Sequence, residues 1–359
     1  MAEKKNNSVC EEKTGMRKIL SIVVPVYKVE DYINKCLDSL LVPEEQLRML
    51  DVVVVNDGTP DDSALRAKEY EKKYPEVFRV IDQENRGHGG AWNHGTELAV
   101  GKYLFYLDSD DWFDTSELSK LITYLKDCDV DLVLMDRKKY FAKQDRFDDV
   151  SLQNMEPDHV YDANTFDWLG SGNGANITYP HNTVYRTCLL QQYQPLFCEH
   201  VMYDDVSMQV IPIAIANSFV YKKLNVYRYY IGRSGQSFDP KVRMQYGGEH
   251  LTKVLMYLLV WMKQHRDVAP KGTTRRVWFD YMLSDFGICH YGELSKTSWE
   301  KAKSLLESWD VFIRTEFPDM MIKDEAKDYR ELPFPFFMLK YRLKRQKKRI
   351  RNFIHRCIK

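Results

Sequence analysis

The chain has 359 residues, of which 44% are hydrophobic and 29% are charged. This length accommodates one large domain with an appendage or two modest domains, and the apolar share is sufficient for a sizeable buried core. The formal net charge of zero argues against a protein that coats nucleic acid through general charge attraction.

Strand and helix patterns alternate along the first part of the chain. Continuous β-branched runs over 20–27 and 50–56 predict strands that are covered on both faces. Apolar residues at helical spacing predict a helix over 31–41, with Asp31 as its N-cap. The alternation continues with helices over 61–73, 90–100 and 116–125 and strands over 77–82, 103–107 and 131–135. This order predicts an α/β fold with a doubly wound, mostly parallel sheet.

The regular pattern ends after Asp136. Residues up to about 176 are polar and irregular, and we expect loops there. A helix is expected after Asp205, and an extended segment over 219–230. Apolar stripes then predict helices between about 244 and 317, which we interpret as a helical C-terminal appendage.

Acidic residues follow two of the predicted buried strands. Asp57 comes after the second strand, and Asp108, Asp110 and Asp111 come after the fourth. Ligands of open α/β sheets bind beyond the carboxyl ends of the strands, so we expect these acids at one rim. A rim of carboxylates suits Mg²⁺ or Mn²⁺, which also binds substrate phosphates and neutralises a departing diphosphate. The 108–111 segment alone would fit a simple turn with an N-cap, but its position favours the metal site.

Other phosphate-binding and catalytic motifs match poorly. The Gly-rich stretch over 85–91 follows the third strand, and Trp92 occupies the third glycine position of the dinucleotide fingerprint. The sequence contains no P-loop, GxSxG or HExxH motif. The motifs therefore give no support to an NAD or FAD enzyme, a P-loop nucleotidase, a serine hydrolase or a zincin.

Four short motifs in order resemble family 2 glycosyltransferases of the GT-A fold, which build bacterial surface polysaccharides. They are SIVVPVY at 21–27, NDGT at 56–59, ENRG at 84–87 with Asn93 and Gly95, and LDSDD at 107–111. The similarity is specific over about 18–116 and looser to about 240. It implies inverting transfer of a sugar, favouring a UDP-sugar donor, to a saccharide or lipid-linked acceptor, with Mn²⁺ or Mg²⁺ as cofactor.

The resemblance also implies roles for single residues at the donor site. Asp57 would accept a hydrogen bond from the base, Asp110 would bind the metal, and Asp108 would contact the ribose or the metal. Arg233 would hold the diphosphate, with Arg228 as a competing candidate, because a guanidinium suits phosphate geometry. The other expected nucleotide-sugar-binding residues are Pro25, Val26, Tyr27, Glu30, Arg86, Asn93 and Ser237. A strand end or a helix cap would explain some of these residues equally well. Trp92 departs from the arginine common in the family.

The resemblance places the catalytic base in the pair Asp204-Asp205. An inverting transfer needs a base within hydrogen-bond reach of the acceptor hydroxyl, on the face opposite the leaving diphosphate. By analogy this base is Asp205. Two aspartates before a helix are also an ordinary N-cap. We expect one of them to cap the helix and the other to act in catalysis.

The predicted domain plan has four parts. A disordered lead-in covers 1–16, and a GT-A catalytic domain covers 17–240, with a donor half to about 115 and an acceptor half from about 116. A helical domain over 241–335, a candidate for homo-oligomer contacts, precedes a basic amphipathic tail over 336–359. The last twenty residues include ten Lys or Arg and no acid, which predicts contact with an anionic membrane surface. Nucleic acid and a protein partner are the rival ligands for the tail; no nucleic-acid partner is expected.

Cysteine use and segment composition predict the location. Seven scattered cysteines without a CxxC pair favour a reducing compartment and no zinc site. The polar start lacks the apolar region of a signal peptide, and the longest apolar run, near 254–262, is too short to span a bilayer. These features predict a cytoplasmic protein that is peripheral at the inner face of the cell membrane.

Two rival functions stay open. A nucleotidyltransferase on a similar sheet would show a basic, Gly-rich loop after the first strand, where residues 25–28 read PVYK. A non-catalytic, transferase-like scaffold is disfavoured because Asp57, Asp108, Asp110 and Asp205 are all present.

Overall fold

The computed structural model describes residues 18–233, 240–294 and 296–317. They divide into two compact units. Of the described residues, the first unit contains 18–200, 204–233 and 267–278, and the second contains 201–203, 240–266 and the rest from 279 onward. The predicted lead-in, the basic tail and Ser237 lie outside the described residues.

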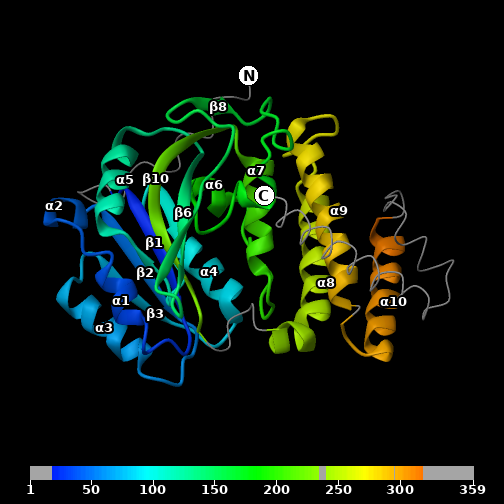
Figure 1. Ribbon diagram of the computed structural model, residues 1–359, viewed down its shortest axis with the longest axis horizontal. Coiled ribbons are helices and arrows are strands. Elements are labelled where there is room, and N and C mark those ends of the chain that lie inside the picture. Colours follow the sequence, from blue (N-terminus) through cyan, green and yellow to red (C-terminus); the bar gives the residue numbers. More distant parts are fainter. Residues whose placement is uncertain (1–17, 234–239, 295, 318–359) are drawn as a thin grey trace. The chain divides into compact units, whose positions relative to one another are not determined.

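A mixed sheet of ten strands is the frame of the first unit (Figure 1). Its order is β3-β2-β1-β4-β9-β6-β10-β5, with β7 beside β6 and β8 beside β10. The strands are β1 (Leu20–Val26), β2 (Leu50–Asn56), β3 (Phe78–Asp82), β4 (Tyr103–Tyr106), β5 (Trp112–Phe113), β6 (Leu132–Phe141), β7 (Arg146–Val150), β8 (Val160–Asp162), β9 (Thr183–Arg186) and β10 (Ser218–Ile231). The strands β3, β2, β1 and β4 are parallel, and β9 is antiparallel between β4 and β6.

The side chains of β1 are buried on both faces of the sheet. Every residue of β1 is buried. Ile22, Val24 and Val26 belong to the same core cluster as α1 (Ile33–Asp38) and α3 (Ser63–Lys73), while the alternate residue Val23 meets α4 (Gly87–Leu98). Helices therefore cover both faces, and the predicted doubly wound α/β fold is confirmed.

Strand register brings the acidic turns to one edge. Leu20 pairs with Leu50 and Val26 with Asn56, so β1 and β2 end level with each other. In β4, Tyr106 pairs with Val23, and the Leu107 N–H donates to the Val23 carbonyl at 3.0 Å. Asp57 and Asp108 therefore follow the two strands that flank β1 and lie at the same rim, as the sequence predicts.

Close approach of α4 to the sheet depends on a glycine. A Cβ atom at Gly95 would lie 2.2 Å from Cγ1 of Val23, closer than packed carbons can approach. The helix begins at Gly87, three residues before the predicted start. This places His88 in its first turn.

The other helices of the first unit are short or well capped. They are α2 (Glu44–Leu47), α5 (Thr115–Asp127), the 3₁₀ helix η1 (Gly174–Asn176), α6 (Thr187–Gln192), the 3₁₀ helix η2 (Asp204–Gln209) and α7 (Ile211–Ile215). Asp114 caps α5, because its carboxylate accepts from the backbone N–H groups of Ser116 and Glu117 at 3.1 Å each. At α1, the N-cap residue is Tyr32 and not the predicted Asp31.

Two other expectations are wrong. The polar stretch after Asp136 is not irregular, because β6 continues to Phe141 and pairs with β7, and β8 pairs with β10. The outer half of β6 and both added strands are only partly buried, so they carry no apolar signal. The expected helix after Asp205 is a 3₁₀ turn followed by α7. Pro212, in the first turn of α7, has no N–H to donate to the carbonyl four residues earlier, and its ring would clash there in a continuous helix. Proline fits the first turn of a new helix.

The second unit is helical, as the apolar stripes predict. It contains α8 (Pro240–Gln264), most of α9 (Thr274–Leu294) and α10 (Trp299–Glu316). The buried residues of α10 are Ala302, Leu306, Trp309 and Ile313, which form one face of that helix. None of the helices within the described part of the chain is long and apolar enough to cross a membrane.

Candidate active site

Asp57 is fixed at the rim by the segment after β3. Its side chain is buried, and Oδ1 accepts from the Gln83 side-chain amide and from the Arg86 backbone N–H, both at 2.7 Å. The Asn85 side chain donates to the Asp57 carbonyl at 2.9 Å. Gly58 follows with φ of +66°, a conformation that suits glycine in this turn. The carboxylate is thus held in one orientation where a ligand of the sheet would bind.

The turn after β4 is held in place by β10. The Asp111 N–H closes the turn on the Asp108 carbonyl at 3.0 Å. The buried Asp111 carboxylate accepts from the Tyr227 hydroxyl at 2.7 Å and from the Tyr230 N–H at 2.6 Å. Burial and the nearby Asp110 and Asp108 raise the pKa of Asp111. These contacts orient the turn so that Asp108 lies at the rim.

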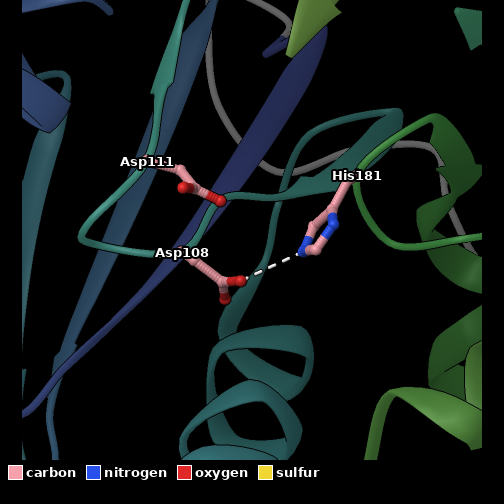
Figure 2. A group of neighbouring side chains, drawn as sticks. All are labelled: Asp108, Asp111 and His181. Carbon is pink, nitrogen blue, oxygen red and sulfur yellow. Dashed lines mark hydrogen bonds and ion pairs between the residues drawn. The ribbon is translucent and has the colours of Figure 1, made fainter. Parts of the chain in front are cut away.

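Asp108, Asp111 and His181 form a group that could hold a metal ion (Figure 2). One potential ligand atom from each lies within 4.8 Å of the others. His181 comes from the loop before β9, and its Nε2 lies 3.0 Å from Oδ2 of Asp108. Burial lowers the pKa of His181, which favours a neutral imidazole with a lone pair for a metal. Two carboxylates suit Mg²⁺ or Mn²⁺, and the imidazole favours Mn²⁺ of the two.

Asp110, the predicted metal ligand, faces Arg233 and is not one of the three residues of this group. Its Oδ2 lies 3.4 Å from Nε of Arg233, and the Arg233 guanidinium also lies over the Tyr32 ring. The structure therefore brings Arg233 to the acidic turn. The competing candidate Arg228 is buried and pairs with Asp114 at 2.8 Å.

The two predicted catalytic aspartates have different environments. Asp204 is buried; its Oδ1 accepts from the Asp205 N–H at 3.0 Å, and its Oδ2 lies 2.8 Å from Nδ1 of His88. Asp205 is partly buried, and its Oδ2 accepts a hydrogen bond from the Tyr179 hydroxyl. Burial and the neighbouring Asp204 raise the pKa of Asp205 to about 6. Such a carboxylate is largely ionised at neutral pH and still a stronger base than an exposed aspartate.

His88 connects the Asp204-Asp205 pair to the acidic turn after β4. Its Nδ1 faces Asp204 and its Nε2 lies 2.8 Å from Oδ1 of Asp108. Burial opposes protonation of His88, but Asp204 and Asp108 outweigh it and raise its pKa. The neighbouring Gly89 permits this approach, since a Cβ there would lie 2.6 Å from the Cys198 carbonyl oxygen.

His88, His181 and Tyr179 were not expected from the sequence as site residues. His181 and Asp108 are 73 positions apart, and no motif relates them. His88 lies inside the Gly-rich stretch, and a histidine between glycines at the start of a helix was the one local signal available.

The remaining predicted residues lie around the rim in varied roles. Pro25 and Val26 are buried at the end of β1, and the Val26 carbonyl accepts from the Asp57 N–H at 3.0 Å. Tyr27, the next residue, is 43% exposed and could stack on a base. The Glu30 carboxylate accepts from the Asp62 N–H at 3.3 Å.

Arg86 and Asn93 make contacts that account for their side chains without a ligand. Arg86 forms two hydrogen bonds to the carboxylate of Glu199. The Asn93 amide donates to the Phe197 carbonyl at 2.9 Å and accepts from the Leu196 and Phe197 N–H groups. Both residues connect α4 and its N-cap to the segment before Asp204.

A protein-family model described as glycosyl transferase family 2 matches residues 21–193, which include the acidic turns, His88 and His181. The putative glycosyltransferase EpsH of Bacillus subtilis (strain 168) is 29% identical over 232 residues, covering 62% of this chain and 64% of EpsH. Residues 21–193 therefore form a glycosyltransferase family 2 domain. It spans 64% of the length of this curated relative.

Two solved structures resemble this chain over most of its length. TarS 1–349 of S. aureus, in complex with UDP-GlcNAc, is 18% identical with a TM-score of 0.50, covering 87% of this chain and 92% of TarS 1–349. The mannosyltransferase PcManGT from Pyrobaculum calidifontis, in complex with GDP-Man and Mn²⁺, is 15% identical with a TM-score of 0.50. The match covers 92% of this chain and 87% of PcManGT. The likeness confirms the predicted GT-A fold.

Proposed function

We propose that this chain is an inverting glycosyltransferase that uses a nucleoside diphosphate sugar, in particular a UDP-sugar. The acceptor is a hydroxyl of a saccharide or lipid-linked molecule in cell-surface polysaccharide synthesis. The observation that carries the proposal is the chain of contacts from Asp205 through Asp204 and His88 to Asp108. It joins a carboxylate of raised pKa to the turn expected to face the donor diphosphate.

Asp205 is the proposed general base. As the acceptor oxygen attacks the anomeric carbon, its proton passes to Asp205, and the bond to the diphosphate breaks with its electron pair leaving on oxygen. A base with a pKa of about 6 is ionised before the reaction and can hold the proton during it. Asp204 supports the same step, because its carboxylate fixes the Asp205 backbone.

Asp57, Arg233 and the acidic turn form the proposed donor side. Asp57 would accept the N–H of uracil, which favours UDP. Asp108, Asp111 and His181 would hold Mn²⁺ or Mg²⁺ together with the predicted ligand Asp110, and the bound ion would neutralise charge on the diphosphate. The bound molecules of the two similar structures, UDP-GlcNAc and GDP-Man with Mn²⁺, support this donor class.

A thermal-shift panel tests the donor site. UDP, GDP, dTDP and CDP are added with and without Mn²⁺ to the wild type, Asp110→Asn and Asp108→Asn, with the exposed Asp62→Asn as control. We expect UDP to raise the melting temperature only with Mn²⁺. This stabilisation should be lost in Asp110→Asn and Asp108→Asn and should persist in Asp62→Asn. Stabilisation by another diphosphate would change the donor class. No stabilisation of the wild type by any nucleotide would contradict the proposal and favour the scaffold alternative.

We also propose that the basic tail over 336–359 brings the enzyme to an anionic membrane surface on the cytoplasmic side, where a lipid-linked acceptor would lie. The charge pattern of the sequence supports this. A full-length variant with the ten tail cations replaced by Gln should bind anionic vesicles much less than the wild type does. Equal binding would refute the role of the tail.

A further inference from the structure

A buried arginine lies against the tyrosine that donates to the proposed base. Arg137 of β6 is 4% exposed, and its Nη2 donates to the Asn176 side chain at 2.9 Å. Its Nη1 is covered by protein and has no hydrogen-bond acceptor among the described residues. The guanidinium carbon lies 4.9 Å from the centre of the Tyr179 ring.

The position of this charge is costly unless something balances it. A buried cation without a paired anion loses hydration that protein contacts must replace. Tyr179 lies against the guanidinium, and its hydroxyl donates to the carboxylate of Asp205. Tyr179 thus contacts both the buried cation and the base, and a cation over a ring face is itself an attractive contact.

We propose that Arg137 and Tyr179 are positioning residues for Asp205. Arg137 fixes the Tyr179 ring, and the Tyr179 hydroxyl fixes Oδ2 of Asp205, which leaves Oδ1 to receive the acceptor proton. Tyr179 keeps its own proton throughout. This inference rests on the proposed function, since it assigns Asp205 the role of base.

The contacts distinguish positioning of Asp205 from general support of the fold. Tyr179 and Arg137 touch the base side of the site, whereas Asp57 is held by Gln83 and Arg86. Loss of the Tyr179 hydroxyl should therefore impair the chemical step and spare donor binding. The hydroxyl also lowers the pKa of Asp205, so its removal should raise that pKa and move the acid limb of the rate profile to higher pH.

The chain offers matched controls. The Tyr221 hydroxyl, like that of Tyr179, donates to an aspartate, at 3.0 Å from both oxygens of the buried Asp136. Arg186 of β9 is an arginine paired with Asp129 and Asp131, at 2.9 and 3.1 Å. The variants are Tyr179→Phe, Arg137→Lys and Arg137→Gln, compared with Tyr221→Phe and Arg186→Lys.

Two measurements test the proposal. The first is release of UDP from the UDP-sugars, with kcat, donor KM and pH profile for each variant. We expect Tyr179→Phe to lower kcat about tenfold, the effect of one lost hydrogen bond, with an unchanged donor KM. Arg137→Gln should lower kcat similarly, and Arg137→Lys should recover part of the loss because it keeps the charge. The controls should keep wild-type kcat.

The second measurement does not depend on turnover. A ¹³C NMR titration of labelled aspartate carboxyls, assigned with Asp205→Asn, gives the midpoint of Asp205 directly. We expect about 6 in the wild type and a higher value in Tyr179→Phe. Unchanged kcat and midpoint would overturn the inference, and a higher kcat would show that Tyr179 blocks the base. If wild type binds no nucleotide, the proposed function fails, and the titration still decides whether Tyr179 controls Asp205.

Discussion

Replacing Asp205 with Asn should abolish transfer and at the same time stabilise the fold at neutral pH. The folded protein raises the pKa of this aspartate from 3.8 to about 6. Between those values the folded state therefore binds more protons than the unfolded state does, so the group's contribution to stability falls as pH rises. The cost is absent below about pH 4 and fully present above about pH 7.

The size of the effect follows from the shift. One pKa unit corresponds to about 1.4 kcal/mol, so a shift of about two units amounts to about 3 kcal/mol. Part of the side chain reaches solvent, and screening there reduces the expected gain to about 2 kcal/mol. Asparagine is nearly the same size and does not ionise, so it avoids this cost and cannot accept the acceptor proton.

Urea unfolding of wild type and Asp205→Asn, measured from pH 4 to pH 8, checks this reasoning. The variant should gain stability relative to the wild type as pH rises and level off above about pH 7. Asp62→Asn, at an exposed position, should follow the wild type throughout. If the variant is no more stable than the wild type at pH 7.5, or if the difference in stability does not change with pH, Asp205 does not have a raised pKa in the folded protein.

Three further substitutions probe other parts of the account. His181→Ala should lower the affinity for Mn²⁺ about tenfold, measured by titration calorimetry, and so weaken the Mn²⁺-dependent stabilisation by UDP. Its melting temperature without nucleotide, measured by thermal shift, should stay within a few degrees of the wild type. Gly95→Ala should cost about 1–3 kcal/mol of unfolding free energy, because its Cβ would lie 2.2 Å from Val23, and wild-type stability would contradict the tight packing. Asp114→Ala should cost about 1–2 kcal/mol, because the α5 cap and the partner of Arg228 are both lost; a change below 0.5 kcal/mol would argue against that capping role.

The predictable part of the fold is the part with strong local signals. β1 and β2 are continuous β-branched runs, and both lie within two residues of their predicted bounds. β7 and β8 were missed because they are short, charged and partly exposed, and their partners β6 and β10 define them. The break after Asp205 could have been inferred from Pro212, which cannot continue the hydrogen bonding of a helix that begins before it.

The candidate site divides in the same way. Asp57 and Asp108 could be placed at one rim because parallel register brings strand ends together. His88, His181 and Tyr179 reach the acids from a helix start and a loop, and only the folded chain shows which histidine or tyrosine faces which carboxylate. Asn93 illustrates the converse, because its motif position suggested a donor contact while its amide bonds to the 196–197 backbone.

The most direct test of the central claim is the stereochemistry and base dependence of turnover. Wild type and Asp205→Asn are incubated with α-linked UDP-sugars and Mn²⁺, and the anomeric configuration of the first product, whether glycoside or free sugar, is read by ¹H NMR. We expect release of UDP with a β-configured product in the wild type and loss of that product in the variant. A product of retained α configuration, or full activity in Asp205→Asn, would contradict an inverting mechanism with Asp205 as its base.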